Sequence, residues 1–282
     1  MRELQALPTR KGLMKKGFLA VSLLLSSLTV YGDARFEELS KKDVEDVTKE
    51  FATNFTHTIS SAPSTNGLWG IEFGLTAATM GSPKLKDAVN ASGGDGKDFE
   101  TLYSGGGYLR VHVPFELFFE SSILPSTKIS EVEVDNFTFG VGWNAGSFFN
   151  LPFDLALGYD VSNGEISFTQ EVTDSVTSAT GTSKIKLESR TQKAWVGASK
   201  KLLFFTPYAK VGVINMNSEL AASANVNFDI FNYSSAQKET VKKSSTYWAA
   251  GVQADLSVLS IGVEAMSALG NTRYAAKLGF SF

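Results

Sequence analysis

The two histidines, His57 and His112, are the side chains of this sequence best suited to acid–base catalysis near neutral pH. A histidine activates a serine hydroxyl when the two side chains lie within hydrogen-bonding reach. His57 follows a segment with helical periodicity and is expected in solvent, so His112 is the only candidate base. No G-x-S-x-G motif picks out a serine partner. We therefore expect no enzymatic activity and assign no catalytic residue; a hydrolase is the third of three functional hypotheses.

The composition excludes other kinds of chemistry. The chain has no cysteine, which excludes disulfides and thiolate metal sites. Its 26 basic and 29 acidic residues give a net charge of -3, so no basic surface for nucleic acid is expected. We expect no metal, no cofactor and no nucleic-acid partner.

The elements that would position functional side chains are strands, because from Gly67 onward apolar and polar residues alternate with a period of two. Around Glu72, for example, Ile71 and Phe73 point to one face and the carboxylate to the other. The alternation predicts ten strands, with eight or twelve as alternatives, in an all-β antiparallel barrel over 67–282. Their predicted ranges are 67–80, 104–118, 127–134, 137–146, 152–169, 183–199, 206–219, 239–256, 258–267 and 272–282.

The strands have properties typical of a membrane barrel. Most are about ten residues or longer, which matches a tilted crossing of the hydrocarbon layer. Pairs of phenylalanine occur at 118–119, 148–149 and 204–205, beside predicted short turns, and such rings form girdles at the lipid boundary. The long polar stretches 81–103, 171–183 and 231–245 are predicted as loops on the opposite side, and Asp135-Asn136 as a further turn.

The polar face of these strands carries charges of both signs. Inside a barrel they could fill the lumen as salt bridges, as in small barrels, or line a narrow polar path. The residues predicted to line the lumen are Glu72, Arg110, His112, Glu116, Asp154, Asp160, Lys210, Asp255, Glu264 and Lys277.

The N-terminus predicts export. Lys15 and Lys16 precede an apolar run at 18–30, which has the length of a signal-peptide core and is too short for a spanning helix. Residues 1–34 are therefore predicted to be a signal peptide, and Met14 is the better translation start.

These features together resemble the Gram-negative outer-membrane β-barrel superfamily, and in particular uncharacterised predicted outer-membrane proteins with an N-terminal helix. The resemblance rests on the signal segment, the alternating strands and the aromatic C-terminal residues Tyr274, Phe280 and Phe282. It implies residence in the bacterial outer membrane, contact with its lipid, and a C-terminal signal read by the barrel-assembly machinery.

Residues 35–66 are predicted to form a helix and a linker on the periplasmic side of the barrel. The helical period of Val44, Val47, Phe51 and Phe55 marks the helix. It could dock in the periplasm, plug the barrel or pair with a partner; because a ten-stranded barrel has little room, plugging would predict twelve or more strands.

Two leading functions follow from this organisation. The first is passive passage or binding of small solutes, hydrophobic ones included. The alternative is a structural or surface-interaction barrel that acts through extracellular loops. A barrel with an open lumen would favour the first and a sealed barrel the second.

Overall fold

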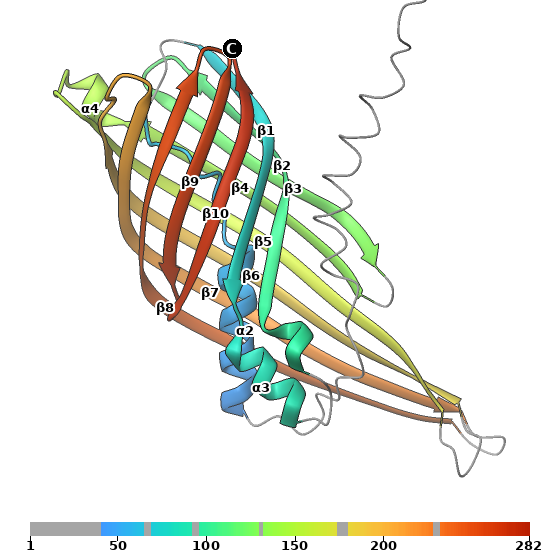
Figure 1. Cartoon of the computed structure of the whole chain (residues 1–282). Coiled ribbons are helices and arrows are strands. Elements are labelled where there is room, and N and C mark those ends of the chain that lie inside the picture. The colour runs from blue at the N-terminus through green and yellow to red at the C-terminus, as the bar shows by residue number, and fades with distance from the viewer. Residues whose placement is uncertain (1–40, 65–68, 92–95, 130–131, 174–179, 228–231) are drawn as a thin grey trace, which may run out of the picture.

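The computed structural model describes residues 41–64, 69–91, 96–129, 132–173, 180–227 and 232–282 (Figure 1). The predicted signal peptide at 1–34 and the start at Met14 lie outside the described residues.

The described residues form ten strands that close into one antiparallel barrel, in which each strand pairs with its neighbours in sequence and β1 pairs with β10. This confirms the predicted fold class. The strands are β1 (Gly70–Gly81), β2 (Thr101–Val113), β3 (Leu117–Ile129), β4 (Val132–Asn144), β5 (Asp154–Thr173), β6 (Thr180–Ser199), β7 (Phe205–Asn227), β8 (Asn232–Leu256), β9 (Leu259–Ala268) and β10 (Asn271–Ser281).

The last residue closes the barrel. Phe282 and Ile71 exchange main-chain hydrogen bonds of 2.9 and 3.0 Å, and Phe73 lies opposite Phe280 in the β1–β10 register. The Phe73 ring also stacks on the Phe282 ring at 6.0 Å. The aromatic C-terminus thus forms part of the seam; its reading by the assembly machinery stays a prediction.

The two ends of the barrel differ. The turn end carries Phe282 and the connections 114–116, 145–153, 200–204 and 257–258, including α4 (Ala145–Phe148). The loop end carries the β1–β2 connection, which holds α3 (Pro83–Ala91) and the 3-10 helix η3 (Gly96–Phe99). In Figure 1 the turn end is at the top and the loop end at the bottom.

The second hairpin corrects two sequence predictions. The chain turns at Phe115 and Glu116, which have positive φ angles, so β2 ends at Val113 and residues 117–129 form β3. Phe118 and Phe119 therefore follow the turn, at the start of β3, instead of preceding a turn as predicted. Pro125 lies in β3 where the register with β4 shifts between Leu124 and Thr127. Such an irregularity tolerates proline, which has no main-chain N–H to donate to the neighbouring strand. The predicted turn at Asp135-Asn136 was also wrong, since both residues belong to β4 and pair with residues of the neighbouring strands.

The described parts of two predicted long loops, 171–183 and 231–245, are strands instead. β5 continues to Thr173, β6 begins at Thr180, and β7 and β8 extend to Asn227 and from Asn232. These extensions project beyond the rest of the barrel as a four-stranded sheet, which we call the protruding sheet (Figure 1). Sequence alternation missed it because residues in water on both sides of a strand need not alternate.

The N-terminal helix lies inside the barrel. α2 (Lys41–Phe55) occupies the loop-end half of the lumen, and residues 56–64 continue toward the turn end (Figure 1). Every residue from Phe51 to Pro63 is buried. Of the three expected positions this is the plug, and it occurs in a barrel of ten strands instead of the twelve or more expected for it. The side of the membrane on which residues 35–66 lie stays a prediction. None of the described helices is long and apolar enough to cross a membrane.

Candidate functional site

The lumen holds α2 and the residues that follow it, and the inner wall binds this whole segment. We call its buried part, residues 51–64, the plug. At the loop end, Lys243 of β8 forms an ion pair with Glu45 of α2 at 2.9 Å. At the turn end, Gln253 Oε1 accepts from the Ala62 amide at 2.9 Å. The chain is therefore threaded through the barrel, from Lys41 at the loop end to β1 at the turn end.

Seven of the ten residues predicted to line the lumen are buried on the inner wall. They are Glu72, Arg110, His112, Asp160, Lys210, Glu264 and Lys277. Asp154 and Asp255 lie at the rim of the turn end and are partly exposed. Glu116 lies in the β2–β3 turn instead of on the wall, because the strand ends at Val113 before reaching it.

Buried carboxylates on the wall are each paired with a cation. Glu72 lies 2.5 Å from Lys277 Nζ, and Tyr108 donates to it at 2.6 Å. Glu264 lies 3.4 Å from Lys210 Nζ and accepts from Tyr208 at 3.0 Å. An unpaired charge buried in a protein is costly, so charged side chains can fill a lumen only when they are paired in this way.

In two further ion pairs the sequence predicted only one of the two residues. Asp160 lies 3.0 Å from Lys193 Nζ and accepts from the Trp195 indole at 2.9 Å. Glu120 lies 3.3 Å from Arg110 Nε. The signal for Lys193 was present, since it alternates with apolar Ala194 and Val196 in β6; Glu120 was hidden by the misplaced β2–β3 turn.

Three wall cations also recognise the main chain of the plug. Arg110 donates to the carbonyls of Ala62 and Ser64 at 2.9 Å each. Lys193 donates to the His57 carbonyl at 2.8 Å. The plug from Thr56 to Ser64 has no regular secondary structure, so its carbonyls need outside donors when buried.

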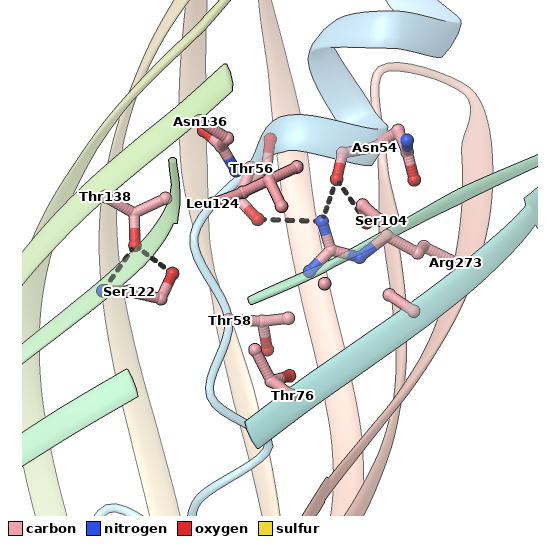
Figure 2. A pocket seen from close by; sticks show the side chains of 12 residues that line it. Asn54, Thr56, Thr58, Thr76, Ser104, Ser122, Leu124, Asn136, Thr138 and Arg273 are labelled. Carbon is pink, nitrogen blue, oxygen red and sulfur yellow. Dashed lines mark hydrogen bonds between the residues drawn. The ribbon is translucent and has the colours of Figure 1, made fainter. Parts of the chain in front are cut away.

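Arg273 of β10 makes the densest of these contacts. Its Nη1 donates to the carbonyls of Thr53, Asn54 and Thr56 at 3.1, 2.6 and 2.8 Å, which satisfies carbonyls at the C-terminal end of α2. Figure 2 shows this guanidinium beside a cavity of about 20 Å³ lined also by Thr58, Thr76 and Ser104. A space of this size is about that of one or two waters, far below a solute path.

His57 is at the centre of the plug and not in solvent, which corrects the sequence expectation. It is 2% exposed, and its amide donates to Ser162 Oγ at 2.7 Å. Its ring nitrogens contact Thr138 Oγ1 at 2.5 Å and Glu120 Oε2 at 3.2 Å. His57 thereby joins the plug to β3, β4 and β5.

His112, the candidate base, is buried near the turn end against the Phe118 ring, 6.1 Å between centroids. Its Nδ1 has no hydrogen-bond partner among the described residues. Among the described residues no serine side chain is hydrogen-bonded to the His112 ring, and the absence of enzymatic activity stays a prediction. The described residues also hold no group of three or more acidic or histidine side chains placed for a metal.

Inward aromatic rings at the turn-end half lie across glycines of the adjoining strand. Phe118 and Trp195 lie opposite Gly142 and Gly158 in the register. A Cβ at Gly158 would lie 2.2 Å from the Trp195 ring. These glycines thus leave room for rings flat against the wall.

The loop-end half of the lumen is apolar instead. Val47, Phe51 and Phe55 of α2 pack in one cluster with Leu85 of α3 and Leu187 of β6. This cluster explains why α2 has a helical apolar stripe: the stripe faces a core, inside the barrel.

Glu50 joins the two helices in this core. Its carboxylate accepts from the amides of Lys84 and Leu85 at the start of α3, at 2.9 and 2.8 Å. Burial raises the pKa of Glu50, although the two amide hydrogen bonds act in the opposite direction. At the exposed start of α2, hydrogen bonds from Lys243 and then Lys49 lower the pKa of Glu45 to about 2.

The exterior of the barrel is apolar. On β1, Ile71, Phe73 and Leu75 point outward and remain about half exposed, and each other strand presents similar residues. At the turn end the phenylalanine pairs 148–149 and 204–205 are exposed, in agreement with the predicted girdle, whereas Phe118 points inward. A closed barrel with an apolar outer band and a polar interior is the architecture of barrels that span the bacterial outer membrane.

The chain forms a closed antiparallel barrel with an apolar outer band. No protein-family model matches the chain, and no curated protein matches it. Among solved structures, it is similar to the attachment invasion locus protein Ail of Yersinia pestis, with 11% identity over 76% of this chain and 97% of Ail, and a TM-score of 0.30. It is also similar to the translocator domain of the autotransporter NalP from Neisseria meningitidis, with 10% identity over 86% of this chain and 95% of that domain, and a TM-score of 0.36. The similarity of this barrel to both concerns its architecture alone.

Proposed function

We propose that this barrel spans the bacterial outer membrane, is sealed, and acts at the cell surface through the protruding sheet and the exposed start of α2. The observation that carries the proposal is the occupied lumen. The passive passage of solutes, the other leading hypothesis, has less support because the plug is buried from Phe51 to Pro63.

The fixation of the plug supports the same conclusion. A plug that moved aside to open a path would have to leave buried cations such as Arg110 and Arg273 without the carbonyls they now contact. Leaving a buried charged donor unsatisfied costs about 1–3 kcal/mol or more per group. The contacts from Lys193 and Lys277 to His57 and Ser61 add to this cost.

The proposed orientation places the loop end outside the cell. Bacterial barrels keep their short turns in the periplasm and their long connections outside. The C-terminal residue and the turns at 114–116 and 257–258 would then be periplasmic. The protruding sheet and the start of α2 at Lys41, which lies 3.7 Å from Glu239 of that sheet, would face the medium.

Conductance across a planar bilayer tests the proposal. We expect the full chain to be silent and a variant lacking residues 41–64 to form steady conducting pores. As a matched control, Lys41→Gln/Glu239→Gln alters the exposed pair at the helix start and should stay silent. Steady conductance of the full chain at the level of the deletion variant would overturn the sealed barrel.

A further inference from the structure

The outward face of β6, β7 and β8 carries a polar groove of about 430 Å³ just beyond the apolar band, toward the loop end. Two cross-strand rows form it. Gln192, Asn215 and Ser244 lie side by side in the first row, and Arg190, Asn217 and Lys242 in the second. Met216 and Lys243 also border the groove, although their side chains point to the opposite face, Lys243 to Glu45 of α2.

The groove begins where the membrane-facing residues end. Val213 and Trp248 point outward and are about half exposed, and Asn215 and Ser244 follow them along β7 and β8 on the same face. With a rise of about 3.4 Å per residue and a tilt of about 40°, the two rows lie about 5 and 10 Å beyond Val213. Trp248 supports this boundary, because tryptophan gathers at the level of lipid headgroups.

The charges of the groove are available for a ligand. Within the described residues, neither Arg190 nor Lys242 lies in an ion pair, whereas the carboxylates farther along the same face do. Glu165 and Glu188 lie 3.0 and 2.6 Å from Lys186 Nζ. Glu219, the third of these carboxylates, lies 2.5 Å from Lys238 Nζ.

Neutral donors lie between the two cations. Ser244 donates to Asn215 Oδ1 at 2.6 Å, which leaves the amide hydrogens of Asn215 for another acceptor. Asn217 lies between Arg190 and Lys242 in the register. An arginine, a lysine and side-chain amides on one face form a set that binds phosphate oxygens together with sugar hydroxyls.

We propose that this groove binds the phosphorylated sugar headgroup of a glycolipid in the leaflet that faces the loop end. A lipid is favoured over a dissolved anion because the groove is continuous with the apolar band, so that acyl chains would lie against Val213 and Trp248 while the phosphate contacts Arg190 and Lys242. A groove of this volume is in the range that holds a small-molecule headgroup.

The test compares the thermal unfolding of the purified, detergent-folded full chain with lipid A that carries its phosphates and with lipid A from which they have been removed. We expect the phosphorylated lipid to raise the unfolding temperature and the dephosphorylated lipid to have a much smaller effect. Arg190→Gln/Lys242→Gln should bind the phosphorylated lipid about tenfold or more weakly, since the loss of one charged hydrogen bond alone costs about that factor.

Two further variants keep the test decisive. Lys200→Gln/Lys201→Gln removes the same charge at the turn end and should retain full binding, and Arg190→Lys/Lys242→Arg keeps both charges and should retain most of it. Equal shifts with both lipids, or undiminished binding by Arg190→Gln/Lys242→Gln, would overturn the proposal. An equal shift with inorganic phosphate alone would assign the groove to a dissolved anion and overturn the lipid assignment.

Discussion

Arg273 Nη1 lies 2.6 Å from the carbonyl oxygen of Asn54, so that the last strand of the barrel holds the C-terminal end of its first helix. The two residues are 219 positions apart in sequence. The contact joins closure of the barrel to occupation of its lumen, because β10 must pair with β1 and β9 before Arg273 is in position.

Arg273→Met should therefore loosen the plug. The carbonyls of Thr53, Asn54 and Thr56 would lose their shared donor, at a cost of about 1–3 kcal/mol of unfolding free energy. Heat-modifiable gel migration measures the resulting drop in unfolding temperature. The exposed Lys184→Met should leave that temperature unchanged, and an equal drop in both variants would contradict a specific role for Arg273.

Gly158→Ala should destabilise the turn-end half of the lumen. The added Cβ would lie 2.2 Å from the Trp195 ring and push it away from Asp160, to which it donates. Overpacking of this kind costs about 1–3 kcal/mol. Urea unfolding followed by tryptophan fluorescence measures the loss. At Gly81 a Cβ would meet nothing within 4 Å, so Gly81→Ala serves as the control.

Labelling of single cysteines tests the threading of the chain. The sequence has no cysteine, so each variant carries one reactive thiol. Lys42→Cys, at the exposed start of α2, should react with a membrane-impermeant maleimide on intact cells. Lys200→Cys, exposed at the turn end, should react only after the outer membrane is permeabilised. Reaction of Lys42→Cys only after permeabilisation would place the start of α2 on the periplasmic side.

The contact between α2 and α3 should weaken as the pH rises. The pKa of Glu50 is higher in the folded chain than its ordinary value, because of burial. A carboxyl of this kind stabilises the fold below its unfolded pKa of about 4.3, and that contribution is lost as the pH rises through its folded pKa. Hydrogen exchange of the α3 amides, corrected for intrinsic rates, should show falling protection over this interval.

Glu50→Gln should remove this pH dependence, because the amide does not ionise. Glu100→Gln is the matched control: Lys86 lowers the pKa of Glu100, which gives a contribution of opposite sign, lost as the pH falls. The Glu100→Gln variant should therefore keep the loss of α3 protection at rising pH. A Glu50→Gln variant that still loses protection would assign the effect to another group.

The sequence determined the membrane-spanning wall. A strand that faces lipid outside and a polar interior must alternate, and this rule located the apolar faces of β1, β7, β9 and β10. It also placed Glu72, Glu264 and Lys277 on the polar side, because the parity of a residue within its strand fixes its face. Between Phe118 and Pro125 the sequence could be interpreted as a strand or as a turn, and the turn predicted there is part of β3.

Only the tertiary structure decided what fills the lumen. The residues of the plug carry no pattern that identifies their partners. The groups that bind the wall are mostly main-chain carbonyls, which every residue has whatever its side chain. Their donors, Arg110, Lys193 and Arg273, come from three strands that meet only when the barrel closes. The sequence predicted the apolar stripe of α2. Whether that stripe faces water, a partner or the inner wall depends on contacts between residues some 200 positions apart, such as Thr53 with Ala268.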